Sequence, residues 1–108
     1  SSVAEYIKMI DPKVVSLVAM GYRASISAEE DLLCAEYIKA LVTGETRNFS
    51  EEFADLQYSS GKRFFIPENI DFSPPTDFFL CIMHNRFPFI LKALRRHDGN
   101  IELEKIEV

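Results

Sequence analysis

Residues 14–21 read Val-Val-Ser-Leu-Val-Ala-Met-Gly, an apolar run that ends at a glycine. A continuous apolar run of this length is typical of a strand buried on both faces, and such strands belong to sheets covered by helices. We therefore expect residues 14–20 to form a buried strand of an α/β protein. Ligands in open α/β sheets bind beyond the carboxyl ends of the strands, so residues 21–31 are the first place to look for a site.

Helical patterns lie on both sides of this strand. The first predicted helix covers residues 3–10, with Ser2 as its cap and a proline at its end. Ser27 and Glu30 form a capping box for a second helix, which ends at Thr43-Gly44. Asn48 or Ser50 caps a third helix that reaches about residue 58.

The C-terminal part combines a loop with a hairpin. Prolines and small polar residues predict an ordered loop over residues 59–76, with a short helix near residues 61–65. A short helix capped by Thr76 or Asp77 follows, over residues 78–84. The turn sequence at Asp98-Gly99 then joins residues 87–96 to residues 101–108, whose apolar and charged residues alternate as in a half-buried strand.

Composition bounds the class of protein. A chain of 108 residues with 47% hydrophobic residues forms one domain, and a formal charge of -5 argues against a nucleic-acid partner. No apolar run is long enough to span a bilayer, and no signal peptide is recognisable. Two distant cysteines indicate reduced thiols in a cytoplasmic protein, with one disulfide as the alternative. A chain that starts Ser-Ser-Val and enters a helix at once suggests a fragment of a longer protein.

Three carboxylates open the second helix: Glu29, Glu30 and Asp31. One hypothesis is a Mg²⁺ site, because Mg²⁺ takes one or two carboxylates together with water and substrate oxygens. The more common explanation is structural, since acidic residues in a first turn complement the helix dipole and Glu30 already belongs to the capping box. Asp31 lies beyond the cap and is less easily explained in this way.

Cationic residues and a loop near this helix are candidates for binding an anion. Residues 59–63 read Ser-Ser-Gly-Lys-Arg, and backbone N–H groups of such a loop can hold an anionic group. A solvated turn is the alternative. Arg23 and Arg47 flank the acidic helix and are further candidates. Cys81 and His84 have a ligand-like spacing, but no second Cys/His pair completes a zinc site.

Phenylalanines gather in the region between residues 64 and 89, which holds seven of the nine. Some belong to the core, but so many in a loop-rich region suggest that part of this surface is covered. Either a missing domain or a second subunit, in a homo-oligomer, would cover it.

These residues bear a resemblance to a known family. Residues 17–38, which include Val-Ala-Met-Gly and Ser-Ala-Glu-Glu-Asp-Leu-Leu-Cys-Ala-Glu-Tyr-Ile, resemble the C-terminal half of 2-phosphosulfolactate phosphatases. The similarity continues through Ser-Gly-Lys-Arg at residues 60–63, Asp77, Cys81 and Asn-Arg-Phe at residues 85–87. It covers nearly the whole chain, and the block around Glu30 and Asp31 is its most specific part.

The resemblance implies a Mg²⁺-dependent phosphatase that converts (R)-2-phospho-3-sulfolactate to sulfolactate on the route to coenzyme M. It also implies a three-layer α/β/α fold with a buried parallel or mixed sheet, of which this chain is the portion with the C-terminal β-hairpin. Glu30 and Asp31 become candidate catalytic and metal-binding carboxylates, and Cys34 a family-typical thiol beside them. The missing N-terminal half would supply the rest of the site.

An acidic protein that acts on a small anionic phosphate ester must neutralise charge locally. Arg23, Lys62 and Arg63 are the cations we expect to bind such a substrate. The competing hypothesis is a non-catalytic interaction or regulatory domain, in which the phenylalanine-rich surface serves assembly and the acidic residues only cap a helix.

Overall fold

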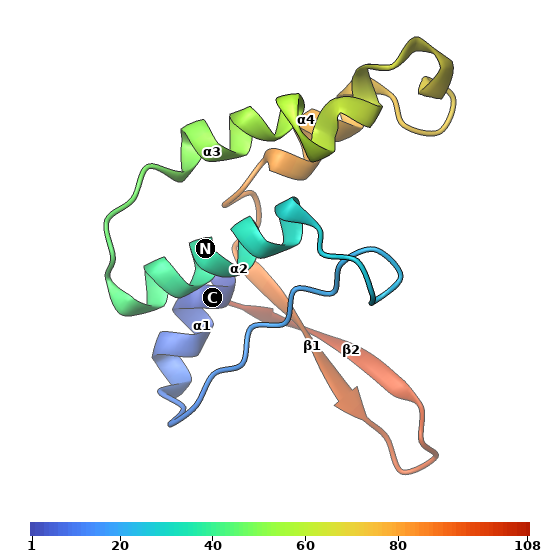
Figure 1. Cartoon of the computed structure of the whole chain (residues 1–108). Coiled ribbons are helices and arrows are strands. Elements are labelled where there is room, and N and C mark those ends of the chain that lie inside the picture. Colours follow the sequence, from blue (N-terminus) through green and yellow to red (C-terminus); the bar gives the residue numbers. More distant parts are fainter.

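The structure is a computed structural model that describes residues 1–108, and most of its regular structure is helical (Figure 1). Three 3₁₀ turns lie between α3 and α4. The elements, in chain order, are α1 (Ser2–Ile10), α2 (Glu29–Thr43), α3 (Phe49–Asp55), η1 (Leu56–Tyr58), η2 (Ser60–Phe65), η3 (Pro67–Asn69), α4 (Pro75–Ile82), β1 (Phe89–Arg95) and β2 (Ile101–Glu107).

The expected fold class is wrong. The sheet contains only two strands, β1 and β2, which pair in antiparallel fashion; there is no buried parallel or mixed sheet and no three-layer α/β/α arrangement. The expected strand at residues 14–20 belongs to no sheet and runs as an open stretch between α1 and the turn before α2 (Figure 1). An apolar run shows that a segment favours burial, but a strand also needs neighbours, and no other segment of the chain pairs with this one.

The C-terminal hairpin is confirmed. Its register pairs Phe89 with Glu107 and Arg95 with Ile101. The turn closes through a hydrogen bond of 2.8 Å from the Arg96 N–H to the Asn100 carbonyl, and Gly99 takes a left-handed φ of 86°. In Figure 1 the turn end of the hairpin projects away from the helices.

Helix boundaries agree with the predictions more closely than helix caps do. Ser1, not Ser2, caps α1, and its hydroxyl accepts a hydrogen bond from the Ala4 N–H. The predicted capping box of Ser27 and Glu30 is wrong, because α2 begins after Ala28, which gives no side-chain hydrogen bond. The positions of α1 and α2 thus follow the apolar pattern. The exact residue at which each helix begins depends on the conformation of the residues just before it.

Later helix ends include two confirmed predictions. Gly44 ends α2 in the left-handed region, with a φ of 78°, and Asn48 caps α3 by accepting a hydrogen bond from the Ser50 N–H. The helix expected from residue 78 starts earlier, at Pro75, because proline at the first position has the φ that a helix requires.

The core lies where α2, α3, η1 and α4 meet. Only eight of the 108 residues are buried. Edge-to-face aromatic contacts support the core: the Tyr37 ring lies 5.2 Å from that of Phe49 and 5.6 Å from that of Phe53. The core cluster consists of Leu33, Ala40, Phe49, Phe53, Leu56 and Phe78.

No helix has the length and the apolar composition needed to cross a membrane.

Candidate functional site

A polar hollow lies at the N-terminal end of α2. Its volume is about 430 Å³, and it is bounded by the turn before α2, the first turn of α2 and the start of η2. The expected site residues Glu30, Asp31 and Arg63 all line it. The full lining consists of Gly21, Tyr22, Ser27, Ala28, Glu29, Glu30, Asp31, Ser60 and Arg63.

Each of the three carboxylates at this hollow contacts a different segment. The Gly21 N–H donates to Asp31 Oδ2 at 2.7 Å, and the Ser60 N–H donates to Glu29 Oε2 at 3.3 Å. Arg63 Nη2 lies 3.4 Å from Glu30 Oε1 in an ion pair. The carboxylates therefore tie the turn before α2 and the η2 segment to the start of the helix.

The second oxygen of Glu30 has no partner. Glu30 Oε2 is buried and makes no hydrogen bond, although the side chain as a whole is 38% exposed. A carboxylate oxygen without a partner in a buried position costs free energy, so this buried atom has unused binding capacity.

Gly21 is required by the turn that bounds the hollow. Its φ is 67°, and a Cβ at this position would lie 2.2 Å from the Ile26 carbonyl oxygen. That carbonyl accepts a hydrogen bond of 2.7 Å from the Tyr22 N–H, which closes the turn. The close approach lets the Gly21 N–H reach Asp31.

Gly61 holds the other wall in place. A Cβ on Gly61 would lie 2.5 Å from the Phe78 ring and 2.6 Å from the Leu56 carbonyl oxygen. The absence of a side chain therefore lets η2 approach α4 and the core closely. Ser60 and Arg63 belong to this packed segment, which places them next to the first turn of α2.

Two of the expected substrate-binding cations lie outside the hollow. Arg23 is in the turn before α2, with a left-handed φ of 53°, and its guanidinium lies 5.2 Å from the centre of the Tyr22 ring. Lys62 is on η2 but is not among the lining residues. Of the expected cations, Arg63 alone lines the hollow with Glu30 and Asp31.

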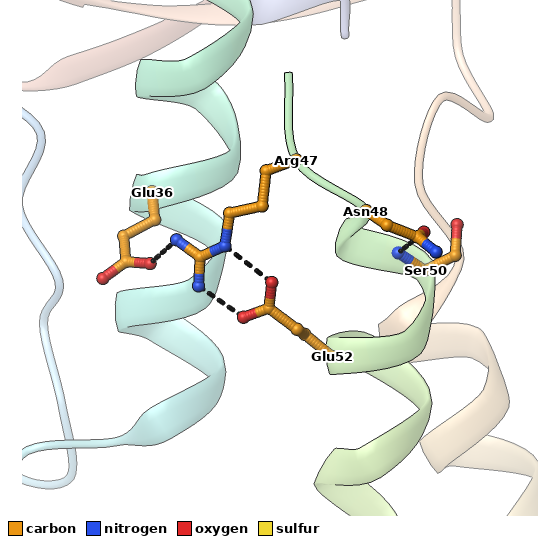
Figure 2. Close-up of polar contacts among 5 residues, drawn as sticks. All are labelled: Glu36, Arg47, Asn48, Ser50 and Glu52. Carbon is orange, nitrogen blue, oxygen red and sulfur yellow. Dashed lines mark hydrogen bonds and ion pairs between the residues drawn. The ribbon is translucent and has the colours of Figure 1, made fainter. Parts of the chain in front are cut away.

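Arg47 is engaged elsewhere. Its guanidinium bridges α2 and α3, with Nη1 2.6 Å from Glu36 Oε2 and Nε 2.6 Å from Glu52 Oε1 (Figure 2). The hydrogen bonds that Arg47 donates to Glu52 and Glu36 raise the pKa of Arg47, and the same contact with Arg47 lowers the pKa of Glu52. Arg47 thus joins two helices and does not line the hollow.

Cys34 lies on α2, one turn beyond Asp31, and lines an apolar cavity of about 390 Å³ next to the hollow. Burial, and secondarily the charge of Asp31, raises the pKa of its thiol. A raised pKa keeps the thiol protonated near neutral pH, which argues against a role as nucleophile. The apolar cavity shares Glu30 and Arg63 with the polar hollow.

Cys81 and His84 line the same apolar cavity. The His84 ring stacks on that of Phe53 with the centroids 5.3 Å apart, which indicates a packing role. Nearby, Asn85 Nδ2 donates to the Tyr37 hydroxyl at 2.8 Å. This last contact was not predicted; the Asn-Arg-Phe motif at residues 85–87 was the only signal for it.

Gly21 and Ser60 are the other residues missing from the predicted set. Both contribute a backbone N–H rather than a side chain, so residue type alone does not reveal them. The glycine directly after the apolar run was a usable signal for Gly21, and it lies in the region where we expected the site.

The donors at the hollow can be compared with what Mg²⁺ requires. No three His, Cys, Asp or Glu side chains are grouped so that they could hold a metal ion. Mg²⁺ is nevertheless bound in many sites by one or two carboxylates, with water and substrate oxygens as the remaining ligands. Glu30, with its unpartnered oxygen, and Asp31 fit such a partial set.

Comparisons of the chain with protein-family models, curated proteins and solved structures find no match.

Proposed function

We propose that this chain carries part of the active site of a Mg²⁺-dependent phosphatase that acts on a small acidic organophosphate. The substrate implied by the family resemblance is (R)-2-phospho-3-sulfolactate. The observation that carries the proposal is that Glu30, which has an unpartnered carboxylate oxygen, lines the same hollow as Asp31 and Arg63.

The residues of the hollow have complementary roles in this proposal. Glu30 and Asp31 would hold Mg²⁺, which supplies charge neutralisation at the phosphoryl oxygens. Arg63 orients the anionic substrate, and its ion pair with Glu30 keeps the guanidinium in place before the substrate binds. Electrostatic stabilisation of this kind supplies most of the catalysis in phosphoryl transfer.

The proposal includes residues from outside this chain. Two carboxylates and one arginine are fewer groups than a phosphatase site needs, so a further polypeptide segment would complete it. We therefore expect the chain alone to bind Mg²⁺ weakly and to turn over little substrate.

Asp31→Asn tests the proposal, because the amide is isosteric and its oxygen can still accept the hydrogen bond from Gly21. We expect loss of Mg²⁺ binding by isothermal titration calorimetry and loss of Mg²⁺-dependent phosphate release in the complete product of the parent reading frame. EDTA should abolish release in the unmodified protein. Glu51→Gln, which removes an acidic residue from the first turn of α3, is the matched control.

An interaction domain is the second candidate, and the exposed apolar surface favours it. Of the phenylalanines in residues 64–89, Phe78 is buried, but Phe65, Phe72, Phe79 and Phe87 are exposed. If Asp31→Asn changes neither Mg²⁺ binding nor phosphate release, the phosphatase proposal is wrong and the interaction domain is the better explanation.

A further inference from the structure

Residues 14–20 have the sequence of a β-strand and no strand beside them. None of the backbone or side-chain hydrogen bonds involves residues 12–20. The segment runs openly between α1 and the turn at residues 22–26 (Figure 1). Its backbone N–H and C=O groups are therefore available for pairing, as they are in an edge strand.

The segment lies against α2 but remains largely open to water. Residues 16–20 line a shallow groove together with Asp31, Cys34, Ala35 and Ile38 of α2. The larger apolar side chains of the segment are nevertheless exposed: Val14 is 81% exposed, Val18 74% and Met20 64%. The helix therefore contacts the segment without covering its apolar side chains.

The chain exposes far more surface than its size requires. Its accessible area is 8296 Å², whereas a compact monomer of this mass exposes about 6,100 Å². The radius of gyration is 16.0 Å, against about 13 Å for a compact domain of this length. The excess of about 2,000 Å² is comparable with one partner's share of an obligate homodimer interface.

Charge restricts where two copies could meet. Each copy has a formal charge of -5, so contact between acidic surfaces is repulsive. Residues 14–22 are the longest stretch of the chain without Asp, Glu, Lys or Arg. A second copy can therefore approach this segment without placing like charges opposite one another.

We propose that residues 14–20 pair with the same residues of a second copy of the chain, as antiparallel strands about a two-fold axis. Such an interface is isologous, the commonest arrangement in homo-oligomers. Leu17 lies at the axis, and Ser16 of each copy lies opposite Val18 of the other. The pairing satisfies the free backbone groups and covers the exposed apolar side chains together.

The symmetric register gives a sharp test by charge substitution at Ser16 and Val18. Both side chains are exposed, so their replacement removes no core contact. One variant carries Ser16→Lys with Val18→Lys, and the other carries Ser16→Asp with Val18→Asp. Each variant alone places four like charges together, whereas a mixed dimer places opposite charges face to face.

Sedimentation velocity over a concentration series, with reductant to keep the free cysteines apart, measures the outcome. We expect the unmodified chain to reach twice its mass of 12.4 kDa, each charged variant to remain monomeric, and an equimolar mixture to recover the dimer. Far-UV circular dichroism checks that the helices of both variants persist.

The exposed apolar face of the hairpin is the matched control. Leu91→Lys with Leu103→Lys adds the same charge to that face and should leave the dimer intact. The proposal is overturned if the unmodified chain is monomeric at every concentration, if the charged variants at residues 16 and 18 still dimerise, or if the mixture stays monomeric. If only the hairpin variant loses the dimer, the interface lies on the hairpin and the proposal is wrong.

Discussion

The two halves of this molecule contrast in how completely they are packed. The closed half, formed by α2, α3, η1, η2 and α4, contains the whole buried core cluster. The open half, formed by α1, residues 12–20 and the hairpin, contains one buried residue, Ala4. The closed half holds together through contacts between elements that follow one another closely in sequence, whereas the open half presents apolar segments that these contacts leave uncovered.

This difference places the buried core and the uncovered apolar surface of the chain in separate regions. The candidate site lies on the border between them, because one wall of the hollow is the packed η2 segment and the other is the turn at the end of the open segment. Covering the open half would therefore also fix the second wall of the site.

Removing an aromatic ring from the closed half gives the largest expected effect. Phe53 is 8% exposed and contacts Tyr37, Phe49 and His84. Phe53→Ala removes these contacts and leaves a cavity, so we expect a loss of about 3–5 kcal/mol in the free energy of unfolding. Urea denaturation followed by circular dichroism measures it.

The matched substitution in the open half is Phe87→Ala, at a side chain that is mostly exposed. Here we expect a change of about 0.5 kcal/mol or less in the monomer. Equal losses for the two variants would show that the halves do not differ in packing as described.

The same contrast explains what the sequence could predict. Helix positions, the Gly44 end of α2, the Asn48 cap and the Asp98-Gly99 hairpin were all predictable, because each depends on residues a few positions apart. The buried sheet was not, because the apolar run at residues 14–20 indicates a preference for burial without naming the partner strands. Patterns over a few residues predict helices, caps and turns. A sheet depends on which distant segments pair, and such patterns do not reveal that.

For the candidate site, the structure brings together three of the residues expected there, and their proposed roles stay predictions. Glu30, Asp31 and Arg63 do meet at one hollow. Arg23 and Lys62 are cationic like Arg63, but neither lines the hollow, and the Arg23 guanidinium lies over the Tyr22 ring. The direction of a side chain on an irregular turn depends on backbone angles that residue type does not reveal.

A smaller loss is expected from filling the close approach of η2 to α4. Gly61→Ala adds a Cβ within 3 Å of the Phe78 ring and the Leu56 carbonyl oxygen, and the backbone carbonyl cannot move freely. We expect a loss of about 1–3 kcal/mol in the free energy of unfolding. The neighbouring substitution Ser60→Ala adds no atom and should change stability little, so a similar loss in both variants would contradict tight packing at Gly61.

The smallest effect is expected at the exposed rim of the closed half, where Arg47 joins Glu36 and Glu52 (Figure 2). The hydrogen bond from Arg47 lowers the pKa of Glu52 below its ordinary value of 4.5, so Glu52 contributes stability that is complete above that value. The contribution is lost as the pH falls through the lower, folded-state pKa. Glu52→Gln should therefore lower the thermal midpoint slightly at pH 7 and have less effect at pH 3.

Glu51→Gln separates this ion pair from the general effect of an acidic residue near a helix start. Glu51 lies beside Glu52 in the first turn of α3 but forms no ion pair. Both variants lose a favourable charge at the helix dipole, and only Glu52→Gln also loses the contact with Arg47. If the thermal midpoints of the two variants follow the same curve between pH 7 and pH 3, the bridge between α2 and α3 adds nothing, and the closed half is held by its apolar core alone.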